Sequence, residues 1–241
     1  MSQLSVTRHG RVAVLTLRRP DGNRLNADMA DAVAAALKSA RTDAEVGACV
    51  VTGFGEVFCL GGDYQGAGPT AHGRTEYARA LIELDQAMAS LGKPLVAAVN
   101  GDAHAGGFSV VIGCDLAVVA ADATLGLPEA AKGLFPFIAL AIVKDALPKK
   151  VLFDLIYNAR LMSAQEACDL HVVNEVVPRA AVLERAIEVA EQAARHNPQI
   201  VTLGRDLYYR TRGLKPDEAS EESRLALLAA LTAKDRRPGS D

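Results

Sequence analysis

Two stretches of this chain contain residue types that could hold a negatively charged oxygen and move a proton. In the first, the apolar run Leu95–Val99 ends at Asn100-Gly101, and Ala105-Gly106-Gly107 leads into Phe108–Ile112. This order predicts a strand, a turn and the start of a short buried helix. The first N–H groups of a helix have no internal partner and lie at the positive end of its dipole, so glycines there let an anionic oxygen approach. The same glycines would also suit close packing of the helix on a strand.

The second stretch is LGLPE, in which Glu129 follows Pro128. Proline restricts the backbone, so the carboxylate is expected on a rigid turn. Leu127, Phe135 and the two residues after Phe135, Pro-Phe, supply apolar surroundings that disfavour the charged carboxylate and raise its pKa. A raised pKa suits a base that works near neutral pH. Glu129 could instead be a first-turn helix acid that serves the helix dipole.

A third stretch, FCLGGD at Phe58–Asp63, follows the strand-like run Ala48–Gly53. Together with KPLVAAVNG at Lys93–Gly101 and LGLPE at Leu125–Glu129, it resembles the crotonase family, also called the enoyl-CoA hydratase/isomerase superfamily. The order and spacing of the three motifs carry the resemblance, which covers nearly the whole chain.

The resemblance implies an α/β fold with a spiral core of ββα units, followed by C-terminal helices that trimerise. It also implies a site for an acyl-CoA thioester, whose oxygen two backbone N–H groups hold. The matching positions are Leu60 and Gly106, and Glu129 matches the retained catalytic glutamate. Coenzyme A would enter as part of the substrate, with no separate cofactor and no metal.

Around these catalytic positions, the resemblance and the neighbouring residues suggest a substrate-binding set: Arg24, Leu25, Gly61, Asp63, His104, Gly107, Ser109 and Phe135. Candidate partners for the coenzyme A phosphates are Arg24, Lys93, Lys234, Arg236 and Arg237, although each could be an ordinary solvated charge. For His104, a core or loop histidine satisfied by a backbone carbonyl is the favoured alternative to a residue that faces the substrate.

The choice between isomerisation and hydration depends on an acidic residue that this chain lacks. Family hydratases with two glutamates carry one of them three residues after the oxyanion-hole glycine, where this chain has Ser109. One carboxylate suffices to carry a proton between C2 and C4, so we favour isomerisation of 3-enoyl-CoA to 2-enoyl-CoA. Hydration of 2-enoyl-CoA and a catalytically silent acyl-CoA-binding protein remain as alternatives. The segment 133–137 lacks the glycine-rich run common in hydratases, so we expect a bulkier pocket wall.

Other chemistries lack their motifs. A hydrolase triad of Ser109, His104 and Asp115 would need G-x-S-x-G, but the chain has Val111 where the second glycine belongs. No P-loop or G-x-G-x-x-G pattern occurs, and the five histidines show no metal-ligand spacing.

Composition limits the class of protein. The 241 residues are 50% hydrophobic, which is enough for one sizeable core. A net charge of -3 without a basic cluster outside the tail argues against nucleic acid as a partner. The four cysteines form no C-x-x-C pair, and neither a signal peptide nor a membrane span is evident. We therefore expect a cytoplasmic protein that does not bind membranes.

The remaining patterns predict the elements that would position the site. Strands are expected at Val12–Leu17 and Leu116–Ala120, and a loop at Tyr64–Gly73. Further expected elements are a helix capped by Asn26, a helix with Tyr77, Leu81, Leu84, Met88 and Leu91 on one face, a short helix capped by Ser163 with a strand before Val177, and helices at Val182–Arg195, Pro198–Arg212 and Glu218–Lys234. We place the core with its acyl-CoA site at residues 1–178 and a helical region at 179–241, which would form a homotrimer or homohexamer.

Overall fold

The computed structural model describes residues 3–235, except the side chains of 233–235, and its core is a six-stranded sheet. The strands lie in the order β1 (Leu4–His9), β2 (Val12–Leu17), β3 (Ala48–Gly53), β4 (Leu95–Val99), β6 (Leu116–Ala120) and β9 (Glu175–Val177). Only β1 runs antiparallel to its neighbour; the other pairs are parallel. The predicted strands at β2, β3, β4 and β6 are confirmed, whereas β1 was not predicted.

A second, three-stranded sheet carries residues of the predicted site. It has the order β5 (Ala103–His104), β7 (Thr124–Gly126) and β8 (Leu161–Ser163). β5 and β7 run parallel, with His104 opposite Gly126. Because α4 (Gly106–Gly113) follows β5 and the segment Pro128–Lys132 follows β7, this sheet brings the Gly106 and Glu129 stretches together.

Helices connect the strands and cover the main sheet. They are α1 (Pro20–Asn23), α2 (Ala27–Thr42), α3 (Ala71–Ala89), α4 (Gly106–Gly113), η1 (Pro128–Lys132), α5 (Phe137–Val143), α6 (Lys149–Tyr157), α7 (Ala164–Asp169), η2 (Arg179–Ala181), α8 (Val182–Ala194), α9 (Pro198–Thr211) and α10 (Pro216–Asp235). η1 and η2 are 3-10 helices.

The predicted helix caps are present. Asn26 accepts the Met29 N–H at 2.9 Å, and Ser163 accepts the Glu166 N–H at 3.1 Å. Helix α3 begins earlier than expected, because the Thr70 hydroxyl accepts the Gly73 N–H and caps it. The predicted loop therefore ends at Thr70 rather than at Gly73.

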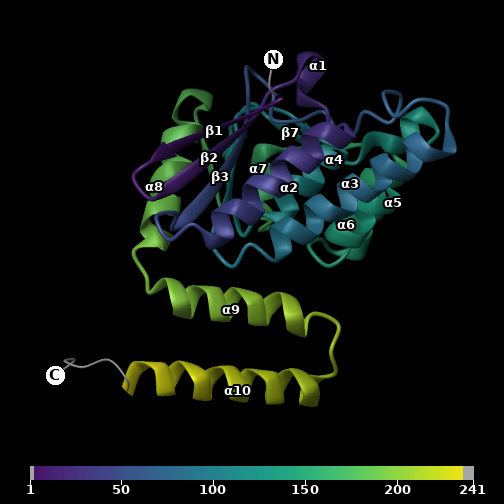
Figure 1. Ribbon diagram of the computed structural model, residues 1–241. Coiled ribbons are helices and arrows are strands. Elements are labelled where there is room, and N and C mark those ends of the chain that lie inside the picture. The colour runs from purple at the N-terminus through teal and green to yellow at the C-terminus, as the bar shows by residue number, and fades with distance from the viewer. Residues whose placement is uncertain (1–2, 236–241) are drawn as a thin grey trace.

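The C-terminal helices fall into two groups (Figure 1). Helix α8 packs against β2, β3, β4 and β6, and its Val182, Ala186 and Ala190 are fully buried. Helices α9 and α10 form a separate layer, in which α10 packs on α9. α9 is tied to the core by Arg205, which forms an ion pair with Asp115 at 2.8 Å. The boundary at residue 178 stays a prediction, but α8 lies with the sheet and α9 and α10 stand apart.

All four cysteines are free thiols. Among residues 3–235, no helix is long and apolar enough to cross a membrane. The cytoplasmic location stays a prediction.

Candidate active site

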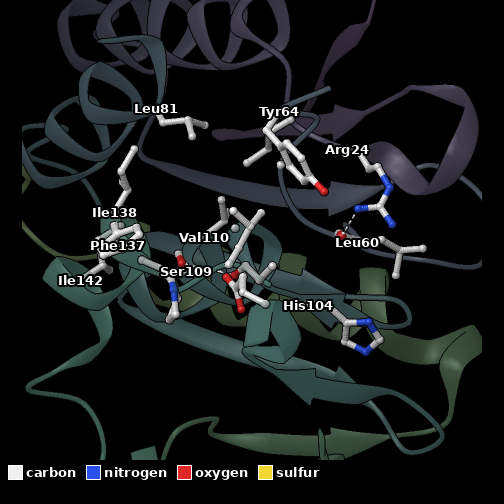
Figure 2. A pocket seen from close by; sticks show the side chains of 18 of the residues that line it. Arg24, Leu60, Tyr64, Leu81, His104, Ser109, Val110, Phe137, Ile138 and Ile142 are labelled. Carbon is white, nitrogen blue, oxygen red and sulfur yellow. Dashed lines mark hydrogen bonds between the residues drawn. The ribbon is translucent and has the colours of Figure 1, made fainter. Parts of the chain in front are cut away.

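A cavity of about 350 Å³ lies between helices α3, α4 and α5, the 3-10 helix η1 and the loops at Arg24 and Leu60. Most of the predicted site residues line it: Arg24, Leu25, Leu60, His104, Gly106, Ser109, Glu129 and Phe135. In Figure 2, Arg24, Leu60 and His104 lie on one side of this cavity, and Leu81, Phe137, Ile138 and Ile142 lie on the other. The cavity thus has a polar side and an apolar side.

Three predicted substrate-binding residues, Gly61, Asp63 and Gly107, do not line the cavity. Asp63 forms an ion pair with Arg19 at 2.9 Å. A Cβ on residue 107 would lie 2.0 Å from the Cys59 carbonyl oxygen, so this glycine permits close packing. Gly61 has φ +102°, and its carbonyl accepts the Leu25 N–H. Gly61, Asp63 and Gly107 therefore hold the loops and the helix beside the cavity without lining it.

Glu129 is the second residue of η1, which Pro128 begins. Its Oε2 atom is buried and has no hydrogen-bond partner among the described residues. Burial raises the pKa of this carboxyl. A hydrogen bond from its own backbone N–H and the charge of Lys132 lower the pKa, but to a smaller extent. The cavity therefore contains a half-buried carboxyl with an oxygen available to take up a proton.

Gly106 is the first residue of α4. Its N–H has no hydrogen-bond partner within the described part of the chain, as expected for a first-turn donor. The preceding Ala105 has φ +52°, and its own N–H donates to the Gly126 carbonyl at 2.8 Å. This unusual backbone conformation turns the chain into the helix beside the cavity.

The backbone N–H of Leu60, unlike that of Gly106, already has a hydrogen-bond partner within the protein. Its N–H donates to the Gly22 carbonyl oxygen at 2.9 Å, so this donor is engaged within the protein. Its carbonyl accepts a 2.6 Å hydrogen bond from the Arg24 guanidinium (Figure 2). Arg24 therefore holds the Leu60 loop from the polar side of the cavity.

The His104 ring belongs to a chain of three side chains. The Thr124 hydroxyl donates to Asp102 Oδ1 at 2.8 Å, and His104 Nε2 lies 2.8 Å from the same hydroxyl. The hydroxyl has only one proton, so Nε2 is the donor and Nδ1 is left as an acceptor. Burial lowers the pKa of His104, which favours the neutral ring. The alternative of a backbone carbonyl partner was therefore wrong, since the partner is a threonine hydroxyl.

Ser109 is buried in α4, and its hydroxyl donates to the Ala105 carbonyl at 3.3 Å. It lines the cavity but provides no carboxylate. Within the described residues, no group of three or more His, Cys, Asp or Glu side chains is arranged to hold a metal ion.

Sequence reasoning missed much of the apolar wall. Tyr77, Leu81, Leu84 and Met88 were interpreted as a core stripe, but this face of α3 also lines the cavity. Asp85, on the same helix, is a second carboxyl that lines the cavity. The sequence does not indicate this position, because an acidic residue next to a core leucine on a helix is usually solvated.

The proposed phosphate contact of Lys93 was wrong. Lys93 is buried, and its Nζ donates to the carbonyls of Ala40 at 2.5 Å and Asp43 at 2.6 Å. The Lys234 side chain and residues Arg236 and Arg237 lie outside the described part of the chain.

Comparisons with known proteins give consistent results. The family model described as enoyl-CoA hydratase/isomerase matches residues 7–240. A carnitinyl-CoA dehydratase of Salmonella heidelberg (strain SL476) is 31% identical over 231 residues, covering 93% of this chain and 87% of that protein.

Among solved structures, an enoyl-CoA hydratase of Mycobacterium smegmatis has a TM-score of 0.89 at 26% identity, covering 99% of both chains. DspI of Pseudomonas aeruginosa has a TM-score of 0.90 at 26% identity, covering 97% of both. The predicted α/β fold is confirmed.

Proposed function

Because this chain belongs to the enoyl-CoA hydratase/isomerase (crotonase) family, we propose that it is an enzyme that removes the α-proton of an acyl-CoA thioester and stabilises the resulting enolate. The observation that carries the proposal is Glu129, which lines the mainly apolar cavity of about 350 Å³ and whose buried Oε2 has no partner among the described residues. A carboxylate in that setting is a strong enough base to take the proton and is free to do so.

In this proposal the enolate oxygen accepts hydrogen bonds from the Gly106 and Leu60 N–H groups. The Gly106 N–H is free of protein partners within the described residues, whereas the Leu60 N–H exchanges the Gly22 carbonyl for the substrate oxygen. A preorganised donor such as the Gly106 N–H contributes about 3–4 kcal/mol to transition-state stabilisation.

We further propose that the reaction is the isomerisation of 3-enoyl-CoA to 2-enoyl-CoA. Glu129 takes the proton from C2, the electrons move onto the thioester oxygen, and the same proton returns at C4 as the double bond shifts. Atoms and charge balance without a co-reactant. The supporting observation is Ser109, whose hydroxyl is committed to Ala105 and which replaces the second acid of two-glutamate hydratases.

A second candidate is the addition of water to a 2-enoyl-CoA or its reverse. It is favoured by the names of the similar proteins, a carnitinyl-CoA dehydratase and an enoyl-CoA hydratase. In this case Glu129 would work with a water held elsewhere in the cavity.

The test is turnover of matched 2-enoyl-CoA and 3-enoyl-CoA thioesters of several chain lengths in deuterated water. Isomerisation in which Glu129 returns the same proton predicts loss of the 3-enoyl species and formation of a 2-enoyl product that carries little deuterium. Faster formation of a 3-hydroxyacyl-CoA would select the second candidate. Binding without double-bond shift, hydration or exchange of the α-proton at any length would contradict an enzymatic role.

We also propose that copies of this chain associate through α10, as a homotrimer or a pair of trimers. This helix packs on α9, yet Leu225, Leu227, Leu228 and Leu231 are each about half exposed. Apolar side chains gathered on one helix are typical of a surface that another subunit covers.

A further inference from the structure

Asp85 is the carboxyl of the cavity that the proposed reaction does not use. It lies on α3, next to Leu84 and one helical turn after Leu81, and it lines the cavity. Figure 2 shows Leu81 on the side of Phe137, Ile138 and Ile142, opposite Leu60 and His104. Asp85 therefore belongs to the α3 wall, on the side that would hold the acyl chain, away from the oxyanion-hole positions.

The surroundings of Asp85 do not compensate its charge. Its carboxylate has no hydrogen bond or ion pair among the described residues. Burial raises the pKa of Asp85, and the opposing charge of Arg212 has a smaller influence. The Arg212 guanidinium forms an ion pair with Asp145, at 3.5 Å, instead of with Asp85. A purely hydrocarbon acyl chain would remove water from this carboxylate and give nothing in return.

We propose that Asp85 binds a hydrogen-bond-donating group, a hydroxyl or an ammonium, carried by the acyl chain of the substrate. The inference rests on the proposed function, because it takes the cavity to hold an acyl-CoA. A donor on the chain pairs with the carboxylate from which the chain removes water, whereas a plain alkyl chain leaves the carboxylate unpaired. Sites built to pair a polar group reject an analogue that lacks it far better than apolar pockets reject a missing methylene.

The test is calorimetric binding of saturated thioesters, which cannot turn over. For butanoyl-, hexanoyl- and octanoyl-CoA, the unsubstituted thioester is compared with its ω-hydroxy and ω-amino forms of the same length. At the length that reaches Asp85, the protein is expected to bind a donor-bearing form about tenfold more tightly than the unsubstituted one. Preference for both forms indicates hydrogen bonding, and preference for the amino form alone indicates charge pairing.

Two variants separate the role of the carboxylate from its packing. Asp85→Asn keeps the shape and should lose the preference for the amino form. Asp85→Leu should reverse the order in favour of the unsubstituted chain. Glu76→Gln is the matched control, because it removes a negative charge from the same helix at a residue outside the cavity lining, and it should leave the ratios unchanged.

Two results would overturn the inference, and they are distinguishable. Equal or weaker binding of the donor-bearing forms at every length, in a protein that still converts enoyl-CoA substrates, would overturn the role of Asp85 alone. Absence of binding of any acyl-CoA would overturn the proposed function as well.

Discussion

The backbone N–H of Leu60 donates to the carbonyl oxygen of Gly22 at 2.9 Å. This bond ties the FCLGGD turn to the short α1 segment, where Asp21, Gly22 and Asn23 all have positive φ. Two non-glycine residues in that region are energetically costly, so the segment stores strain. If Leu60 is an oxyanion-hole donor, substrate must replace Gly22 at this N–H.

The first prediction follows from this exchange. Binding of hexanoyl-CoA should shift the amide resonance of Leu60 in 15N-leucine-labelled protein, because its acceptor changes from a peptide carbonyl to a thioester oxygen. The buried Leu37, on α2 and outside the cavity lining, should shift much less and serves as the internal control. An unchanged Leu60 resonance at saturation would remove this residue from the oxyanion hole.

The second prediction separates the two glycines of α4. A Cβ on residue 107 would lie 2.0 Å from the Cys59 carbonyl oxygen, whereas one on residue 106 would lie 3.4 Å from the Gly62 nitrogen. Gly107→Ala should therefore destabilise the fold by about 3 kcal/mol, lowering Tm by roughly 6–12 °C. Gly106→Val should keep a Tm close to that of the parent and lower kcat/KM about 100-fold.

Leu60→Ala is the control for this pair, because only the N–H of Leu60 is assigned a role. It should cost packing and little turnover. A Gly106→Val protein with normal Tm and unchanged kcat/KM would disprove the assignment of Gly106.

The third prediction concerns stability and pH. Burial raises the pKa of Glu129 above its usual value near 4.5, so the native state binds this proton more tightly than the unfolded chain does. The stability associated with that proton is fully present below the pKa of Glu129 in the unfolded chain. It is lost as pH rises through the pKa of Glu129 in the folded protein. Glu129→Gln should therefore have a higher Tm than the parent at pH 7, and the gap should close as pH falls below about 4.5. A gap of constant size across this range would show that ionisation is not its cause.

The fourth prediction concerns α10. Introducing glutamate at both Leu228 and Leu231 would place charges on the proposed subunit interface, where burying them is costly. Analytical ultracentrifugation should show the parent as a trimer or hexamer and the double variant as a monomer. Ser220→Glu, at an exposed position of the same helix, should keep the parent assembly. A parent protein that sediments as a monomer would contradict the proposed association.

The sequence was sufficient where local chemistry decides the structure. Asn26 reads as a cap because its side chain satisfies an N–H three residues ahead, and Leu95–Val99 reads as a buried strand because it is uninterrupted and apolar. β1 escaped prediction because it is an edge strand whose later residues, Thr7 to His9, are exposed and polar.

The rest depended on long-range contacts. Nothing near Leu60 in the sequence indicates that Gly22 occupies its N–H, and nothing near Lys93 indicates that two carbonyls enclose its ammonium group. Nothing near Asp85 in the sequence indicates a site residue, but α5 packs beside α3, and this face of α3 lines the cavity. These relationships exist only after the chain has folded.

In the proposed reaction Glu129 carries the proton. The kinetics of Glu129→Gln on 3-enoyl-CoA and 2-enoyl-CoA substrates, with acyl-CoA affinity measured in parallel, test this role. The substitution preserves shape and removes the base, so kcat should fall at least ~100-fold while the acyl-CoA Kd stays within roughly threefold. A Glu129→Gln enzyme that turns over both substrates like the parent would show that Glu129 is not the base, and His104 would become the next candidate for that role.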